Sequence, residues 1–433
     1  MTVAIVGGGI AGLTAAALLA KQGQSVAVFE QADHLGGRAE TQTTAGFHFN
    51  LGPHALYRGG WAARVLGDLG IAIEEGKVGT AGSFAFRNNT ILPLPTGPAS
   101  LLTTELFSIG ERLDVIRFLG RVGRIDPRPL ATTTVTDWLG SVTQRDNVRR
   151  FIAALIRVSS YCNAPHEVSA GAAIEQLQIA IRSGVTYLNG GWHTLVDRIH
   201  QRAVASGATI YTGAGVRALE YESGHVRGLQ LNDGTFMPAT AVILAVPPKV
   251  ASSLLGNGAG SKLRNWIDSS TPVQAACFDL GVANLPRPDR FFALGIDVPI
   301  YLSVHSRWAD LAPKAGGLVH AAKYLPATGS TDPEADRREL ERLMDVVQPG
   351  WQKQIVHRRF LPRLPVTHAI VRAKDGGLAG RPHVDAPAIS NVFLAGDWVG
   401  DRGMLVDAAF ASALQAARFA VGKEKPMLQA ELV

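Results

Sequence analysis

Three glycines near the start of the chain have the spacing of a phosphate-binding turn. Gly7, Gly9 and Gly12 follow a short apolar run and precede an Ala/Leu-rich stretch. Glycine at the second position lets backbone N–H groups approach a pyrophosphate, and the helix that follows presents partial positive charge at its N-terminus. Glu30 ends the next apolar run, where a carboxylate accepts hydrogen bonds from ribose hydroxyls and repels a 2′-phosphate. These residues predict a dinucleotide-binding unit.

The residues that follow Glu30 resemble a longer fingerprint. Residues 35–38 read Leu-Gly-Gly-Arg, and residues 50–53 read Asn-Leu-Gly-Pro. This spacing is similar to that of the FAD-dependent amine oxidase and phytoene desaturase superfamily, a group of flavoprotein oxidoreductases. The resemblance implies that the Gly-Gly-Arg loop follows the adenosine diphosphate and that Arg38 lies beside the pyrophosphate and the flavin. The family usually has an acid where this chain has Asn50, whose amide still donates and accepts hydrogen bonds.

A second motif of the same superfamily lies near the C-terminus. Residues 392–397 read Val-Phe-Leu-Ala-Gly-Asp and precede a small-residue stretch, residues 404–422. The resemblance implies that Asp397 binds a ribityl or phosphate oxygen. It also implies that the backbone at Met404 and Leu405 faces the flavin C2 carbonyl, and that the backbone of Val216 contacts the adenine. We therefore expect FAD as the cofactor, held by Gly7, Gly9, Ile10, Ala11, Gly12, Glu30, Gln31, Gly37, Arg38, Gly52, Pro53, Val216, Gly396, Asp397, Met404 and Leu405.

Two kinds of oxidation compete for this cofactor. Flavin amine oxidases of the superfamily usually carry a lysine near flavin N5, and Val273 occupies that place here. The desaturase branch is favoured by Gly52-Pro53-His54, by Asp-Leu-Ala-Pro at 310–313 and by Gly396-Asp397-Trp398. We expect dehydrogenation of a hydrophobic, isoprenoid or carotenoid-like substrate by hydride transfer to flavin N5, in a mainly apolar pocket. The alternatives are an amine oxidase, a protoporphyrinogen-type oxidase, a redox-neutral isomerase that uses reduced flavin, and a flavoprotein that binds a partner without turnover.

His54 and Tyr57 are the candidate catalytic residues, because they emerge directly from the cofactor motif. A histidine in such a loop is more often a hydrogen-bonded structural residue than an acid or base. His305 and Tyr324 lie on expected strands of the substrate domain. The other histidines lack ligand spacing, so no metal is expected. No second nucleotide-binding turn is found, so we expect oxygen, a quinone or another carrier to reoxidise the flavin.

The order of predicted elements indicates an α/β protein. Apolar strands and helices recur in three separate segments, which we assign to a Rossmann-like FAD-binding domain at 1–53, 190–260 and 376–425. The intervening segments, 54–189 and 261–375, are expected to form an inserted α+β substrate domain. The first would be a mostly helical insertion and the second an antiparallel sheet, with strands expected at 273–280, 300–305 and 317–325 and a helix at 332–347.

One predicted helix of the insertion, residues 101–124, combines an apolar stripe with arginines. Its stripe runs through Leu106, Ile109, Leu113, Ile116 and Leu119, and its arginines are Arg112, Arg117, Arg121 and Arg124. The favoured interpretation buries the stripe in the core and leaves the arginines solvated. The alternative places this face, or the basic and aromatic residues 287–292, against anionic lipid.

The composition describes a well-cored chain of two or three domains. Of 433 residues, 46% are hydrophobic and 18% charged. The two cysteines, Cys162 and Cys277, are far apart, which fits a reducing cytoplasm. The net charge of +6 is mild, and no basic cluster is interleaved with aromatics, so nucleic acid is not an expected partner. With no signal peptide or long apolar run found, we expect a cytoplasmic enzyme for a small hydrophobic substrate, with peripheral contact to the inner face of a membrane as the alternative.

Overall fold

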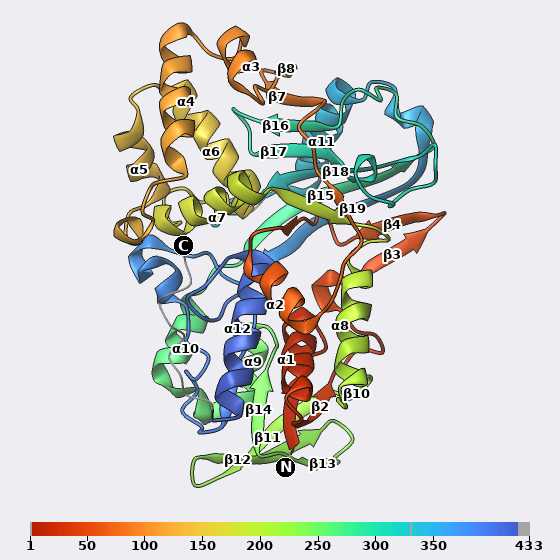
Figure 1. The fold of residues 1–433 in the computed structure, drawn as a ribbon, viewed down its shortest axis with the longest axis vertical. Helices are drawn as coiled ribbons and strands as arrows, with labels where there is room; N and C mark the ends of the chain where they lie inside the picture. The colour runs from red at the N-terminus through yellow and green to blue at the C-terminus, as the bar shows by residue number, and fades with distance from the viewer. Residues whose placement is uncertain (1, 330, 423–433) are drawn as a thin grey trace.

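The computed structural model describes residues 2–329 and 331–422. The chain forms two lobes, with β1 and the N-terminus in the lower one (Figure 1). A parallel sheet lies in the lower lobe, and a larger sheet with a group of helices beside it lies in the upper lobe. Within the described residues, no helix has the length and apolar character needed to cross a bilayer.

A five-stranded parallel sheet forms the core of the lower lobe. In spatial order its strands are β10 (Thr209–Tyr211), β2 (Ser25–Phe29), β1 (Thr2–Val6), β14 (Ala241–Leu244) and β20 (Val392–Leu394). The central strands are apolar runs buried on both faces, as parallel sheets require. Helix α1 (Ile10–Lys21) packs between α8 (His193–Ala205) and α12 (Leu405–Ala420) (Figure 1). The carboxyl ends of the strands share one edge, where ligands bind in such folds.

Smaller elements complete the lower lobe and its border. One of them is a three-stranded antiparallel sheet of β11 (Val216–Glu222), β12 (His225–Leu231) and β13 (Phe236–Pro238). The remaining elements are the hairpin of β3 (Thr41–Thr44) and β4 (Phe47–Asn50), the short sheet of β5 (Leu56–Tyr57), β9 (Val185–Leu188) and β6 (Glu75–Lys77), and helices α2 (Trp61–Leu69), α9 (Pro248–Leu255) and α10 (Gly260–Ser269).

A seven-stranded sheet forms the upper lobe. Its order is β19 (Ile355–Thr367), β15 (Val273–Val282), β18 (Gly317–Tyr324), β17 (Ile300–Val304), β16 (Phe292–Gly295), β7 (Ser83–Arg87) and β8 (Thr90–Pro93). The expectation of an antiparallel sheet is wrong at one pairing, because β7 from the helical insertion runs parallel to β16. Strand β19 was not predicted, since Pro362 and Pro365 interrupt its pattern. An edge position tolerates them, and the register shifts along β19 accommodate them.

The two faces of this sheet are covered by different helices. Side chains alternate along a strand, so neighbouring residues of β15 face opposite sides. Phe278 packs toward α11 (Pro333–Val347), whereas Cys277 faces the helical insertion. The insertion consists of α3 (Pro98–Thr103), α4 (Ile109–Val122), α5 (Val135–Val142), α6 (Asp146–Ser160) and α7 (Ala170–Ser183).

The predicted helix over 101–124 is two helices, α3 and α4, and its predicted core face is wrong. Ser108 begins α4 with a capping box to Glu111. Of the predicted stripe only Leu106 is buried. Its other members are exposed, and the core face of α4 is made by Val115, Phe118 and Val122. Both sets have helical spacing, so periodicity alone could not choose between them.

Candidate functional site

The first glycine turn lies at the carboxyl end of β1, and its geometry requires glycine. Gly7 has φ +106°, and a Cβ there would lie 2.5 Å from the Ala245 carbonyl oxygen. A Cβ on Gly12 would lie 1.9 Å from the Gly7 oxygen. Gly9 differs, because its added Cβ would meet nothing closer than Gly36 at 3.8 Å. Contacts within the fold therefore do not require glycine at position 9, and the open space beside it is available to a ligand.

Several predicted adenosine-side residues gather around Glu30 at the end of β2. The Glu30 carboxylate accepts hydrogen bonds from the Gly8 N–H (2.6 Å) and the Ala32 N–H (2.9 Å). The Ala214 N–H donates to the Glu30 carbonyl at 2.8 Å, which brings the start of β11 and Val216 to this edge. The turn, the acid and Val216 thus share one end of the parallel sheet.

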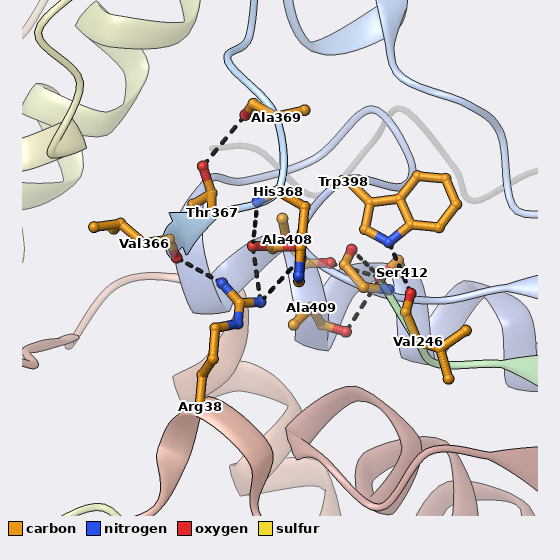
Figure 2. A network of polar contacts seen from close by, with 12 residues as sticks. Arg38, Val246, Val366, Thr367, His368, Ala369, Trp398, Ala408, Ala409 and Ser412 are labelled. Atoms are coloured by element: carbon orange, nitrogen blue, oxygen red, sulfur yellow. Dashed lines mark hydrogen bonds and ion pairs between the residues drawn. The ribbon is translucent and has the colours of Figure 1, made fainter. Parts of the chain in front are cut away.

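A buried ion cluster joins the first cofactor segment to the last. Asp397 is almost fully buried; its carboxylate lies 2.9 Å from the Arg38 guanidinium and 2.7 Å from His368 Nδ1 (Figure 2). Arg38 also donates to the Val366 carbonyl at 2.7 Å. Burial alone would raise the pKa of Asp397, but Arg38 and His368 outweigh burial and hold that pKa below its ordinary value. Asp397 is therefore an anion at neutral pH.

His368 is a site residue that the sequence did not reveal. It follows β19, a strand that was itself not predicted, and no motif surrounds it. Its ring and its backbone N–H both contact the Asp397 carboxylate. Recognising β19 would have placed His368 at a strand end, but nothing in the sequence paired it with Asp397.

The N-terminus of α12 lies beside this cluster and has uncapped N–H groups. Its N-cap residue, Met404, makes no side-chain capping bond, and Leu405 has φ +54°, a left-handed conformation that is strained for leucine. The turn before the helix is fixed from both sides (Figure 2): the Gly396 N–H donates to Ser412 Oγ at 2.9 Å, and Trp398 Nε1 donates to the Val246 carbonyl at 3.1 Å. A rigid turn thus presents free N–H donors toward a pocket.

That pocket is lined mainly by apolar side chains. Arg381, which was not predicted, is buried there; its terminal nitrogens donate to the carbonyls of Asp397 and Gly403, while its Nε has no hydrogen-bond partner within the described residues. Burial lowers the pKa of Arg381 to about 10, so it stays a cation. The lining residues are Cys162, Val168, Val273, Thr367, Ala369, Val371, Arg381, Asp397, Met404 and Leu405.

No lysine lines this pocket in the described part of the chain, and Val273, at the position expected for lysine in an amine oxidase, does line it. Lys323 lies on the neighbouring strand β18 but turns to the opposite face of the sheet. There it pairs with Asp336 at 2.8 Å and with Glu339 on α11. The Lys323 amine therefore lies on the face opposite the pocket, where two carboxylates bind it.

The two candidate catalytic residues lie in different surroundings. His54 Nδ1 is 3.1 Å from the Gly52 carbonyl, and its ring lies 4.9 Å from that of Trp192. Burial lowers the pKa of His54 to about 4, so its ring is neutral at neutral pH. The Tyr57 hydroxyl is buried and donates to the Ser159 carbonyl at 2.7 Å. Its position favours a structural role, and acid–base catalysis by either residue stays a prediction.

Asn50 stands where the resemblance leads one to expect an acid, and its side chain still makes hydrogen bonds that hold the neighbouring segments together. Its side-chain oxygen accepts hydrogen bonds from the Thr41 hydroxyl (2.7 Å) and from the Trp192 N–H (2.9 Å). The Asn50 carbonyl accepts a further bond from Arg359, which also contacts Asp279. The neutral Asn50 amide thus links the β3–β4 hairpin to the start of α8 through hydrogen bonds alone.

A cluster of tyrosines occupies the space between the sheet and the helical insertion, next to the His54 loop. The Tyr161 and Tyr301 hydroxyls lie 2.8 Å apart, and the Tyr161 hydroxyl also reaches the Pro53 carbonyl at 3.4 Å. The rings of Tyr301 and Tyr324 stack at 5.7 Å with an interplanar angle of 15°. Burial raises the pKa of all three phenols, so they are neutral. None of the three tyrosines belongs to the lining of the pocket at the start of α12, so the expectation of a mainly apolar substrate pocket stays a prediction.

Comparison with known proteins agrees with this geometry. The family model of flavin-containing amine oxidoreductases matches residues 10–420. The chain is similar to 4,4'-diaponeurosporene oxygenase of Staphylococcus aureus (strain bovine RF122 / ET3-1), with 24% identity over 278 residues that cover 55% of this chain and 54% of the relative. It thus spans about half the length of the curated relatives it matches.

Two solved structures show the same fold. An oxidoreductase from Methanosarcina mazei has a TM-score of 0.77 at 19% identity and covers 96% of this chain and 99% of its own. Putrescine oxidase bound to putrescine has a TM-score of 0.72 at 17% identity, with coverages of 98% and 99%. The fold class predicted from the sequence is confirmed. At these identities the two structures inform on fold alone.

Proposed function

The chain belongs to the flavin-containing amine oxidoreductase family and is an FAD-dependent oxidoreductase, and from this premise we propose that it dehydrogenates a hydrophobic, isoprenoid or carotenoid-like substrate. The observation that carries the proposal is the pocket at the N-terminus of α12. Its wall is apolar apart from Thr367 and two charged residues, Arg381 and Asp397, which already bond to protein groups. The pocket has a free volume of only about 10 Å³, so the proposal uses the character of its lining: apolar side chains beside the cofactor residues favour a hydrocarbon neighbour over an ammonium group or a carboxylate.

The residues at the site fit FAD. Gly9 leaves room for a phosphate at the start of α1, whose N-cap makes no side-chain hydrogen bond. The start of α12 has no side-chain cap, and among the described residues the buried Nε of Arg381 has no hydrogen-bond partner; both are donors that a bound flavin, which carries carbonyl acceptors, would satisfy. We therefore propose that the cofactor residues named from the sequence hold FAD, with His368 and Arg381 added.

The protein's part in the reaction follows from these groups. When bound, FAD supplies the hydride acceptor at N5, so that the substrate loses a hydride and a proton. The N–H groups at the start of α12 and the Arg381 cation would stabilise negative charge on the reduced cofactor. The apolar wall around Val273 would orient a hydrocarbon and exclude water. We propose His54, whose ring is neutral, as the acceptor of the substrate proton.

A second candidate, oxidation of an amine, is favoured by the tyrosine cluster next to the His54 loop. The nearly parallel Tyr301 and Tyr324 rings could bind a cation over their faces. The two rings are stacked on one another, however, and leave no room between them for a substrate. The absence of a pocket lysine in the described residues also favours the first candidate.

Anaerobic reduction of the bound flavin separates these functions. We expect a C30 or C40 polyene with saturated allylic positions to bleach the holoenzyme stoichiometrically, whereas putrescine leaves it oxidised. Bleaching by putrescine alone would overturn the desaturase proposal in favour of amine oxidation. Turnover only after chemical pre-reduction would identify an isomerase. Reoxidation of the bleached enzyme by oxygen or by a quinone then identifies the electron acceptor.

A further inference from the structure

Helix α4 carries apolar side chains on two opposite faces, and only one of them meets the core. Val115, Phe118 and Val122 are buried against the helical insertion. At about 100° per residue, a second set lies on the other side of the helix. We call this set the α4 ridge; it consists of Ile109, Leu113, Ile116 and Leu119, which are 76%, 49%, 40% and 41% exposed.

The α4 ridge is an unusual concentration of exposed apolar surface. Leu102 on α3, 59% exposed, extends it. These five residues all fall within residues 102–119, whereas the other large exposed apolar residues are scattered over distant elements. Single exposed apolar residues are normal on protein surfaces, but a contiguous row on one helix marks a contact surface.

Arginines lie on one flank of the ridge. Arg117 is 65% exposed although it pairs with Asp114 at 3.2 Å, and Arg121 and Arg124 continue the positive charge on the same flank. Within residues 2–329 and 331–422, neither Arg121 nor Arg124 forms an ion pair. Arg112 is different, because its guanidinium donates to the carbonyls of Phe107, Leu102 and Thr104 and thereby fixes α3 against α4.

We propose that the α4 ridge docks this protein on the surface of an anionic lipid bilayer. A helix with an apolar row beside a flank of arginines has the pattern of an interfacial helix, whose guanidinium groups reach lipid phosphates while the row enters the acyl boundary. Helix α4 lies at the margin of the upper lobe, away from the parallel sheet (Figure 1), so a flat membrane can approach it. A protein partner would need about 800 Å² of surface with few charges at its centre, and a single narrow ridge beside arginines is poorly suited to that.

The other stretch considered from the sequence, residues 287–292, does not provide such a surface. Phe291 is buried, and Phe292 belongs to strand β16. Arg290 donates to the Val346 carbonyl. These residues hold the sheet to α11 instead of projecting into solvent.

Vesicle flotation of the FAD-loaded protein tests the proposal. The vesicles are phosphatidylcholine alone or phosphatidylcholine with phosphatidylglycerol, at low and high salt. We expect binding only to the anionic vesicles and release by salt. Arg117→Ala/Arg121→Ala should lower the partition coefficient roughly tenfold to thirtyfold. Ile109→Ser/Leu113→Ser should lower it at least about tenfold, because both side chains would enter the membrane.

Matched controls lie elsewhere on the surface. Arg338→Ala/Arg342→Ala removes two exposed arginines at the same spacing from α11, and Val204→Ser/Val250→Ser removes two exposed apolar residues. Both controls should bind vesicles as the unchanged protein does. Flavin absorbance and the oligomeric mass are recorded for each variant. Because no substrate is present, the result does not depend on the proposed chemistry.

Three outcomes would overturn the proposal. The first is no flotation on anionic vesicles at low salt. The second is flotation that the α4 variants and the α11 control reduce equally, which would indicate general charge attraction. The third is a dimer in solution that Ile109→Ser/Leu113→Ser dissociates without any vesicle binding, which would make the ridge an interface between two copies of this chain.

Discussion

Replacing Asp397 by asparagine tests whether the cluster of Arg38, Asp397 and His368 holds the cofactor site together. The carboxylate is 3% exposed and contacts both partners within 2.9 Å. Asparagine keeps the volume but removes the charge, which leaves the guanidinium facing a neutral amide. Removing one member of a buried ion pair costs about 3–5 kcal/mol. Arg38 is 36% exposed, so water compensates in part and we expect a loss of about 2–3 kcal/mol.

The effect should depend on pH with a definite sign. Asp397 has its pKa below the ordinary value in the folded protein, so the unfolded chain binds more protons under acidic conditions. The carboxylate therefore stabilises the fold fully above its ordinary pKa, and this contribution is lost as the pH falls toward the folded value. The difference between the unchanged protein and the asparagine variant should shrink between roughly pH 5 and pH 3.

Urea unfolding of the apoprotein and FAD binding by flavin fluorescence provide the two measurements. Asp401→Asn is the control, because its carboxylate is 56% exposed and lies 3.6 Å from Arg402. It should change the free energy of unfolding by less than about 0.5 kcal/mol. If Asp397→Asn unfolds at the same urea concentration as this control at neutral pH, and binds FAD equally well, the cluster does not hold the site.

Three further predictions concern Glu30, Asp407 and Tyr324. Glu30→Ala should raise the FAD dissociation constant at least about tenfold, measured by flavin fluorescence, through loss of the ribose contact. Burial raises the pKa of Asp407 to about 6, so its ionisation destabilises the fold as the pH rises from roughly 4 to 6; Asp407→Asn should abolish that fall in urea stability. The Tyr324 hydroxyl has no hydrogen-bond partner among the described residues, so Tyr324→Phe should cost less thermal stability than Tyr301→Phe, which removes the bond to Tyr161.

The elements that could be predicted from the sequence are those whose local residue pattern is compatible with only one backbone conformation. Gly7 and Gly12 stand where any side chain would collide with the backbone, so the turn could be read from glycine spacing. Serine is a preferred N-cap residue, and the Ser169 hydroxyl accepts the Ala172 N–H at 3.3 Å at the start of α7. The family resemblance is confirmed by a match across most of the chain.

The parts that could not be predicted depend on contacts between distant segments. His368 and Arg381 are isolated residues in the sequence and become site residues only because β19 and the last segment meet. The tyrosine cluster likewise combines Tyr161 from the insertion with Tyr301 and Tyr324 from the sheet. For α4, two apolar faces with the same period made the choice of core face a matter of tertiary packing.

The position of β20 has a consequence for biosynthesis. This edge strand of the parallel sheet begins at Val392, and Asp397 follows it, 390 positions after Gly7 in the chain. Translation therefore makes the glycine turn long before Asp397, and the cluster of Arg38, Asp397 and His368 cannot close until β20 has been synthesised. Until then, apolar surface of β14, which later pairs with β20, is exposed to chaperones and to aggregation.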